Sequence, residues 1–190
     1  KTYSHDGQVP DSAPTATAIL AGIKTRNSVI GLGPEALVDD CLSGLANRVP
    51  SFIGMAQEAG LATGIVTTTT ITHATPAAGY AHTPQRDWES DAKVPEAAQQ
   101  QDCLDIARQL IEGAVGPRLD VALGGGRSAF IPETGADPEY PDRKGQRRDG
   151  RDLIAAWKRA NPGGTFAWNS EQFKTFDPAR GTRLLGLFEP

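Results

Sequence analysis

The sequence lacks an apolar run of the roughly 18 residues that a membrane-spanning helix requires. It also lacks a strong excess of either charge, because 23 acidic residues stand against 19 basic ones. This mild acidic balance gives no reason to expect nucleic acid or an anionic membrane as a partner. Because Lys1 leads directly into polar, turn-rich sequence, we expect these first residues not to be a signal peptide. We therefore expect the chain to begin either after processing or partway through a larger protein.

Cysteine is scarce, with only Cys41 and Cys103 among 190 residues. Two free buried thiols and one disulfide are both compatible with this composition, and a disulfide would indicate an oxidising compartment. Internal repeats and low-complexity tracts are absent as well. The length suits one domain with a sizeable core.

Helical patterns alternate with apolar strands along the chain. Asp11 and Ser12 precede Pro14 in a pattern typical of a helix start, where a small polar residue caps the first turn. Helical spacing and glycine stops predict the other helices, and short β-branched or apolar runs predict the strands. The expected helices are 49–59, 95–113 and 153–160, and the expected strands are 61–70, 119–123, 165–169 and 183–188.

This alternation predicts an α/β fold with a largely parallel central sheet and helices on both faces. The segment 137–151 is dense in proline, glycine and charge, and we expect it to be a loop. The chain stops at Pro190 directly after an expected strand, which is typical of a truncated domain.

Ser12 is the most informative residue for chemistry. A serine at a helix N-terminus lies among unpaired backbone N–H groups, which attract a phosphate. Its hydroxyl can attack that phosphate once a metal ion lowers its pKa. Taken alone, Ser12 is better interpreted as an ordinary helix cap.

The neighbouring residues change that interpretation. Residues 9–18 read Val-Pro-Asp-Ser-Ala-Pro-Thr-Ala-Thr-Ala and resemble the nucleophile motif of alkaline phosphatases, Asp-Ser-Ala-x-Thr/Ser-Ala-Thr-Ala. The resemblance covers nearly the whole chain and less than half of a typical family member, and animal-type members are the more similar ones. The further segments that follow the family in order and spacing are 66–69, 72–77, 80–83, 86–88, 123–127, 138–141 and 186–190.

The resemblance implies a role for each matching residue. Ser12 would be the nucleophile that becomes phosphoserine, and Arg86 would grip two nonbridging phosphate oxygens with its planar fork. Asp11 would hold the Arg86 guanidinium in place. Thr75 would give its hydroxyl to a magnesium ion, and His73 would lie in the outer shell of that ion. Taken singly, each of these is an ordinary surface charge or polar residue.

Two further features follow from the likeness to animal-type members. In those proteins, glutamates that match Glu139 and Glu189 bind a calcium ion together with the backbone carbonyl at Phe188, and hard oxygen donors suit calcium. The alternative, in which both glutamates are solvated loop charges, stays open. Cys41 and Cys103 match a cysteine pair that forms a disulfide in the same relatives.

The implied reaction is hydrolysis of phosphate monoesters at alkaline pH, at a site with two zinc ions and one magnesium ion. Zinc at such a site takes histidine and carboxylate ligands. The family draws them from an aspartate before the nucleophile motif and from residues well downstream, and none of those motifs occurs here. We therefore expect residues 1–190 to be part of a single catalytic domain, truncated at both ends and inactive alone. For the complete protein, the resemblance implies a homodimer that is secreted, periplasmic or membrane-anchored.

Two other classes of function stay open. One is a serine hydrolase of acyl esters, although no Gly-x-Ser-x-Gly elbow occurs in the sequence. The other is a catalytically incomplete secreted fragment that binds phosphate or calcium at most.

His5 and His82 lack metal-ligand spacing to a partner and are interpreted as structural. The Gly-Gly-Gly-Arg run at 124–127 lacks the Gly-Lys-Ser/Thr ending of a phosphate loop and is expected to be a strand-end turn.

Overall fold

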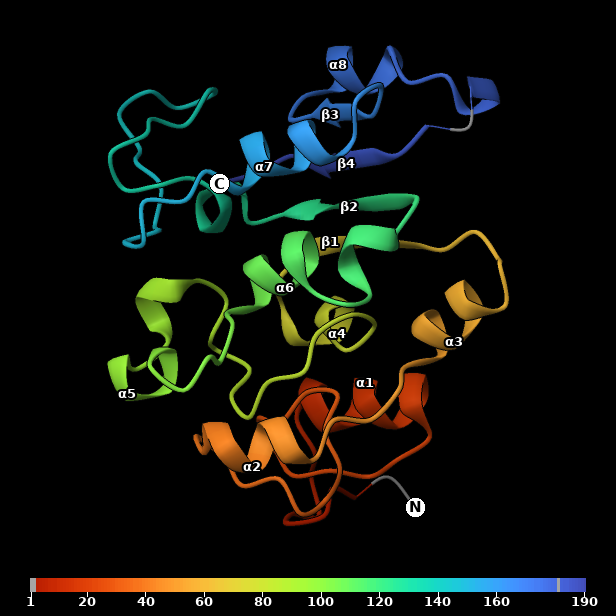
Figure 1. The fold of residues 1–190 in the computed structure, drawn as a ribbon, viewed down its shortest axis with the longest axis vertical. Coiled ribbons are helices and arrows are strands. Elements are labelled where there is room, and N and C mark those ends of the chain that lie inside the picture. The colour runs from red at the N-terminus through yellow and green to blue at the C-terminus, as the bar shows by residue number, and fades with distance from the viewer. Residues whose placement is uncertain (1–2, 181) are drawn as a thin grey trace.

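A four-stranded sheet forms the centre of the protein. The structure is a computed structural model and describes residues 3–180 and 182–190. The strands are β1 (Gly64–Thr70), β2 (Val121–Gly125), β3 (Thr165–Ala167) and β4 (Leu184–Leu187). They are arranged in the order β1-β2-β4-β3, and every neighbouring pair is parallel (Figure 1). The expected α/β fold with a parallel sheet is confirmed.

The α-helices are short, and most are preceded by a residue whose side chain caps the first turn. They are α1 (Ser12–Ala21), α2 (Cys41–Ala46), α3 (Phe52–Glu58), α4 (Ala74–Ala77), α5 (Glu96–Gln99), α6 (Ile106–Glu112), α7 (Leu153–Ala160) and α8 (Ser170–Lys174). The capping residues are Asp11, Asp40, Ser51, Asp105, Asp152 and Asn169. Such side-chain oxygens satisfy backbone N–H groups that a helix start leaves unpaired. Short 3-10 turns are at Asp91–Lys93, Gly116–Arg118, Arg127–Phe130 and Pro178–Arg180.

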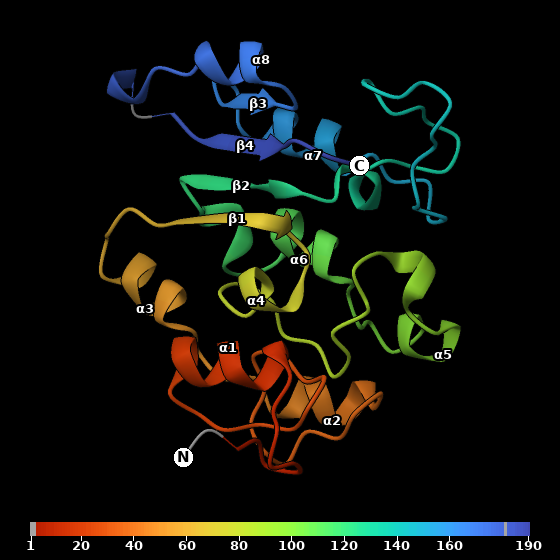
Figure 2. The same cartoon turned by 180° about the vertical axis from the view of Figure 1, so that it is seen from behind.

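One face of the sheet is buried by α4, α6 and α7. Ile65, Ala122, Leu185 and Phe166 are register partners across the four strands and all contribute to the main apolar core. Helix residues in the same core include Ala77, Leu110 and Trp157. Seen from behind, the strands lie in front of α6 and α7 (Figure 2).

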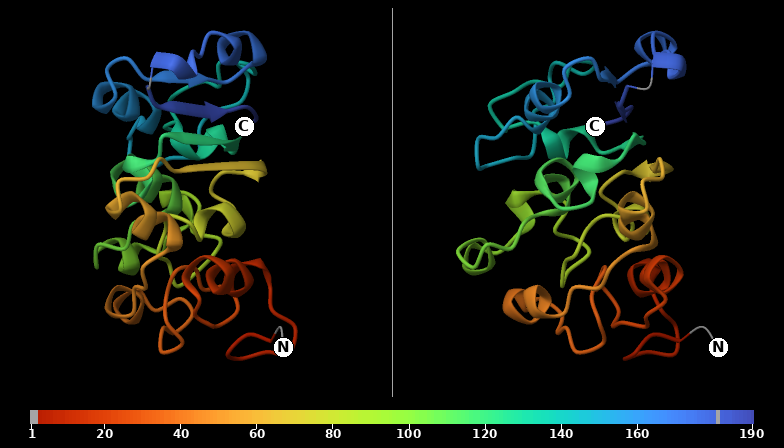
Figure 3. Two further views of the ribbon diagram at one scale, coloured as in Figure 1. Left: turned by 90° about the vertical axis from the view of Figure 1, so that its right-hand side faces the viewer. Right: turned by 45° about the vertical axis from the view of Figure 1, so that its right-hand side comes forward.

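The opposite face is covered over β3 and β4 but open over β1. Helix α8 packs against β3 on the far side from α7 (Figure 3). Its Phe173 ring contacts Phe188 edge-on, with ring centroids 6.0 Å apart. Ala167 of β3 is fully buried, whereas Val66 of β1 is 71% exposed. Helices therefore lie on both faces of the sheet, as expected, but the second layer does not reach β1.

The expected single helix over 95–113 is wrong. The chain forms α5 and α6 with a non-helical break between them. Asp102 takes a left-handed φ of 62°, which a right-handed helix cannot include. Cys103 is joined to Cys41 by a disulfide, and Asp105 caps the new helix α6. The disulfide itself confirms the pairing that the family resemblance implied.

The expected helix over 153–160 is confirmed with the same bounds, and the remaining expected elements are present with shifted ends. Two glycines of the 124–127 run belong to β2, and the turn begins only at Gly126, which has a φ of 85°. β1 begins at Gly64, three residues later than expected. The third strand ends at Ala167 because Asn169 is used to cap α8.

Candidate active site

Ser12 is the first residue of α1, and Asp11 is the residue that caps this helix. The Oδ1 atom of Asp11 accepts from the backbone N–H of Ala13 at 2.9 Å. The cap is therefore a carboxylate, and the Ser12 hydroxyl is not required for capping. At this end of a 10-residue helix, the backbone N–H groups and the helix dipole favour an anion.

A tight loop at 26–28 holds the Asp11 segment. The Asn27 Oδ1 atom accepts from the Asp11 backbone N–H at 3.1 Å, and the Ser28 backbone N–H donates to Asp11 Oδ2 at 3.0 Å. The Ser28 carbonyl accepts from the Arg86 backbone N–H at 2.7 Å. Ser28 has a φ of 66°, which is uncommon for a residue other than glycine. Through its two backbone groups, Ser28 connects Asp11 with Arg86.

The Arg86 guanidinium lies between Asp11 and His73. Its Nη1 atom is 3.5 Å from Asp11 Oδ2, and its Nη2 atom donates to His73 Nε2 at 3.0 Å. Because a guanidinium has no acceptor, His73 Nε2 must accept, and a neutral ring then carries its proton on Nδ1. Within the described chain, the buried His73 Nδ1 has no hydrogen-bond partner. Three segments that are distant in sequence thus meet beside the N-terminus of α1.

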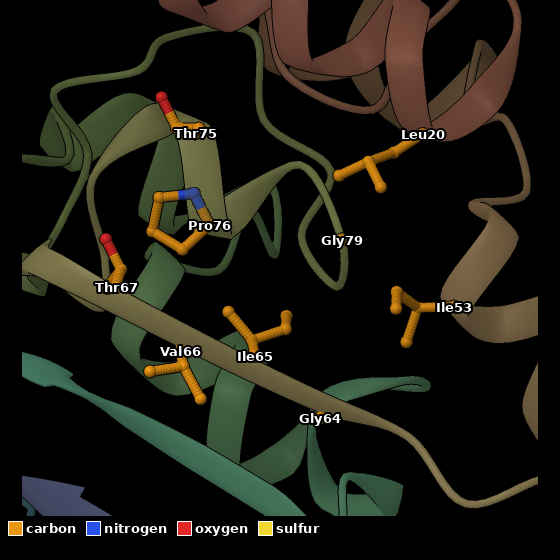
Figure 4. A pocket seen from close by; sticks show the side chains of 9 residues that line it. All are labelled: Leu20, Ile53, Gly64, Ile65, Val66, Thr67, Thr75, Pro76 and Gly79. Carbon is orange, nitrogen blue, oxygen red and sulfur yellow. The ribbon is translucent and has the colours of Figure 1, made fainter.

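Thr75 lies in α4, two residues after His73 and close to the end of β1. It is exposed and lines, together with Thr67, a groove of about 290 Å³ (Figure 4). The apolar walls of this groove include Leu20, Ile53, Ile65 and Pro76. Neither Ser12 nor Arg86 lines the groove, so it is a separate feature from these two candidate residues.

The described residues supply few metal ligands. No three histidine, cysteine, aspartate or glutamate side chains among them form a group that could hold a metal ion. They therefore offer zinc no set of ligands. The exposed Thr75 hydroxyl is an oxygen donor of the kind that magnesium accepts. The unpaired Nδ1–H of His73 suits an outer-shell contact, so these two residues fit a share of a magnesium site.

The Glu139 carboxylate is paired with a buried arginine. Arg127 is fully buried and donates to both carboxylate oxygens of Asp137 at 2.7 Å and to Glu139 Oε2 at 3.0 Å. Its backbone N–H donates to the Glu189 carbonyl at 2.8 Å. Arg127 thereby connects Glu139 with the segment that contains Phe188 and Glu189, but the Glu189 side chain is exposed. A calcium site at these residues stays a prediction.

His82 and His5 have structural contacts. The Nε2 atom of His82 is 2.9 Å from the carbonyl oxygen of Val49. Burial lowers the pKa of His82, which favours a neutral ring that donates to this carbonyl. His5 is exposed, and its backbone N–H donates to the Thr25 carbonyl.

Comparison with known proteins identifies the family. The alkaline phosphatase family profile matches residues 1–190. The chain belongs to the alkaline phosphatase family. It is 43% identical over 196 residues to the tissue-nonspecific alkaline phosphatase of Gallus gallus, and 42% identical over 195 residues to an alkaline phosphatase of Gadus morhua. Both alignments cover 100% of this chain, which spans 37% and 40% of the length of these relatives.

Solved structures of alkaline phosphatases share the fold. The Thermus thermophilus enzyme has a TM-score of 0.67 and 30% sequence identity, over 99% of this chain and 30% of that chain. The enzyme from the Antarctic bacterium TAB5 has a TM-score of 0.67 and 27% identity, over 100% of this chain and 42% of that chain. The sequence family and the fold therefore agree.

Sequence reasoning missed three residues around this site. Asn27 and Ser28 form a pair typical of turns, which could have located the tight loop but not its contacts with Asp11 and Arg86. Glu89 accepts hydrogen bonds from threonines 17 and 19 residues earlier in the chain. No local pattern in the sequence indicates that contact.

Proposed function

We propose that the complete protein containing this chain hydrolyses phosphate monoesters through a phosphoserine at Ser12. The observation that carries the proposal is the Asp11–Arg86–His73 chain of contacts beside the N-terminus of α1, in a member of the alkaline phosphatase family. A helix N-terminus attracts an anion, and a guanidinium next to it can bind the same anion with two parallel hydrogen bonds.

Each step uses a named group of this chain. The phosphate group of the ester binds to those N–H donors of Arg86 that Asp11 and His73 leave free. The Ser12 hydroxyl loses its proton to solvent, and its oxygen bonds to phosphorus. The bond between phosphorus and the ester oxygen breaks, and the leaving oxygen takes up a proton from water and departs as the alcohol. Water then attacks the phosphoserine, which releases inorganic phosphate and restores Ser12. Bound zinc and magnesium would supply the positive charge that ionises the attacking hydroxyl and neutralises the leaving oxygen.

Asp11 and His73 act on Arg86 rather than on the substrate. Asp11 holds one side of the guanidinium at 3.5 Å, and the His73 ring holds the other side at 3.0 Å. With both sides held, the planar fork of Arg86 loses little conformational freedom when phosphate binds.

The cofactors and partners of the complete protein belong to the same proposal. Thr75 and His73 contribute to a magnesium site, and residues outside this chain provide the zinc ligands. A variant of the TAB5 enzyme has been solved with magnesium bound. We further propose calcium at Glu139, Phe188 and Glu189, a homodimer, and a secreted, periplasmic or membrane-anchored location. The described part of the chain contains no helix of the length and apolar character that would span a bilayer.

The proposal is tested by Ser12→Ala in the complete protein, assayed with a chromogenic phosphate ester in the presence of zinc and magnesium. We expect loss of nearly all turnover and of the acid-stable phosphoserine that a rapid quench traps. Ser170→Ala is the matched control, because Ser170 is likewise the first residue of a capped helix but lies in α8. Insensitivity to vanadate together with labelling by an acyl-directed probe would instead indicate an acyl hydrolase.

A further inference from the structure

Glu89 holds the turn that connects β1 to α4. Its Oε2 atom accepts from the Thr70 hydroxyl at 2.9 Å and also from the Thr72 hydroxyl. Thr70 is the last residue of β1, and Thr72 is fully buried. Among the described residues, Glu89 forms no ion pair, so these two hydroxyl donors stabilise the negative charge of its carboxylate. Hydrogen bonds to a carboxylate are stronger than those between neutral groups.

The same turn is held from its other side by Tyr80. The Tyr80 hydroxyl donates to the carbonyl of Ile71, between the two threonines, at 2.9 Å. Burial raises the pKa of Tyr80 well above its ordinary value, and the nearby charge of Glu89 adds to this effect. Tyr80 therefore stays protonated and keeps donating. Because both sides of the turn are fixed, the backbone at His73 and Thr75, which come after the turn, has a defined position.

The segment that carries Glu89 also carries Arg86, and it is anchored at its far end. The carbonyl of Trp88 accepts from the backbone N–H of Ile106 at 2.8 Å, and the carbonyl of Glu89 accepts from that of Ala107 at 3.2 Å. These two carbonyls satisfy N–H groups in the first turn of α6. The segment is thus fixed to α6 through its backbone and to the β1–α4 turn through the Glu89 side chain.

We propose that Glu89 is a positioning residue that couples the phosphate-binding Arg86 to the turn that carries His73 and Thr75. Arg86 and Glu89 are three residues apart, and each contacts the 70–75 segment with its side chain, Arg86 at His73 and Glu89 at the two threonines. Removal of the carboxylate would leave the Arg86–His73 hydrogen bond as the side-chain contact between the two segments. This inference rests on the proposed function, because it assigns Glu89 a role in the same phosphate site.

The test compares Glu89→Ala, Glu89→Gln and Thr72→Val with two matched controls in the complete protein. Glu133→Gln changes an exposed carboxylate, and Thr68→Val makes the threonine substitution on the exposed side of β1. The readouts are kcat, KM, the affinity for inorganic phosphate by calorimetry, magnesium affinity by titration, and the melting temperature.

We expect Glu89→Ala to lower kcat and to weaken phosphate and magnesium binding by about 10- to 100-fold, the range typical of outer-shell partners. Glu89→Gln, which keeps one acceptor oxygen, should recover part of the loss. The effects of Glu89→Ala and Thr72→Val should be non-additive, because both remove the hydrogen bond between Thr72 and Glu89. The controls should match the unsubstituted protein.

Normal kcat and normal phosphate affinity in Glu89→Ala would overturn the inference. A loss of activity that only parallels a loss of melting temperature, with unchanged ligand affinities in the folded fraction, would overturn it too. If the unsubstituted protein does not turn over phosphate esters, the proposed function fails. Phosphate calorimetry then still measures whether Glu89 controls Arg86.

Discussion

At the scale of single residues, two buried arginines show how the protein carries charge in its interior. Arg127 and Arg147 are both fully buried. Arg127 pairs with Asp137 and Glu139, and Arg147 pairs with Asp105 and Asp149. Burying a charge is unfavourable unless partners satisfy it with good geometry, as they do here. Each arginine therefore depends on its carboxylates.

We predict that Asp137→Asn destabilises the protein by about 3–5 kcal/mol at neutral pH. Arg127 stays buried, but the substitution removes the negative charge at position 137 and one of the two oxygens that accept from Arg127. The measurement is urea unfolding at pH 7. Asp142→Asn, an exposed substitution in the same loop, is the control and should change little. Equal midpoints for the two variants would contradict the prediction.

The same substitution has a defined pH dependence. Burial acts to raise the pKa of Asp137, but Arg127 and the backbone N–H groups of Glu139 and Tyr140 outweigh it, and the net shift is below the ordinary 3.8. A carboxylate with a lowered folded pKa stabilises the fold above its ordinary pKa, and this stabilisation is lost as the pH falls through the folded value. The difference in the free energy of unfolding between Asp137→Asn and the unsubstituted protein should therefore be largest at pH 7. This difference should decrease as the pH falls below about 3.8.

At the scale of elements, the region from α5 to α6 depends on a crosslink. Cys41 at the start of α2 is bonded to Cys103, which lies in the break before α6. Both sulfur-bearing residues belong to a small apolar cluster with Trp88, Val94 and Ala98. Trp88 is two residues from Arg86, so the crosslink also supports the segment that carries Arg86.

We predict that the double variant Cys41→Ser, Cys103→Ser loses about 4 kcal/mol of stability, the value that loop-closure entropy gives for the 62-residue separation. Denaturant unfolding with and without a thiol reductant provides the measurement. Reductant should lower the midpoint of the unsubstituted protein and leave that of the double variant unchanged. A double variant as stable as the oxidised protein would show that the disulfide contributes nothing.

At the scale of the whole molecule, the fold gathers candidate site residues from distant segments of the chain. It brings Ser12, Arg86 and His73 into one region, but no three side chains in the described part of the chain form a metal-binding group. One face of the sheet is covered, and the other face is covered over β3 and β4 but leaves Val66 of β1 largely exposed. The chain spans 37% to 40% of the length of its animal relatives.

We predict that residues Lys1 to Pro190, expressed alone with zinc and magnesium, do not hydrolyse phosphate esters at the rate of an enzyme. A serine hydroxyl is a weak nucleophile near neutral pH unless a base or metal activates it, and a catalytic zinc ion needs about three protein ligands. Arg86 should still bind phosphate weakly. The assay compares this chain with the complete protein on one chromogenic ester, and comparable turnover would show that the metal ligands have been misplaced.

The sequence by itself determined the family, the α/β alternation and the identity of the candidate site residues. Capping residues such as Asp11 and apolar strands such as β2 are encoded locally, so their patterns can be read from neighbouring residues. The nucleophile motif is also continuous in sequence, which is why the motif alone was enough to predict roles for Ser12 and Asp11.

Only the tertiary structure decided how distant segments meet. In the sheet, β4 lies between β2 and β3. Arg86 donates a hydrogen bond to His73, and Arg127 donates one to the Glu139 carboxylate. Glu89 accepts from the hydroxyls of Thr70 and Thr72. The tertiary structure also broke the expected helix over 95–113, since the crosslink to Cys41 and the left-handed Asp102 prevail over helical periodicity. Such contacts depend on the path of the whole chain through space, whereas periodicity and capping report only on residues within one or two turns.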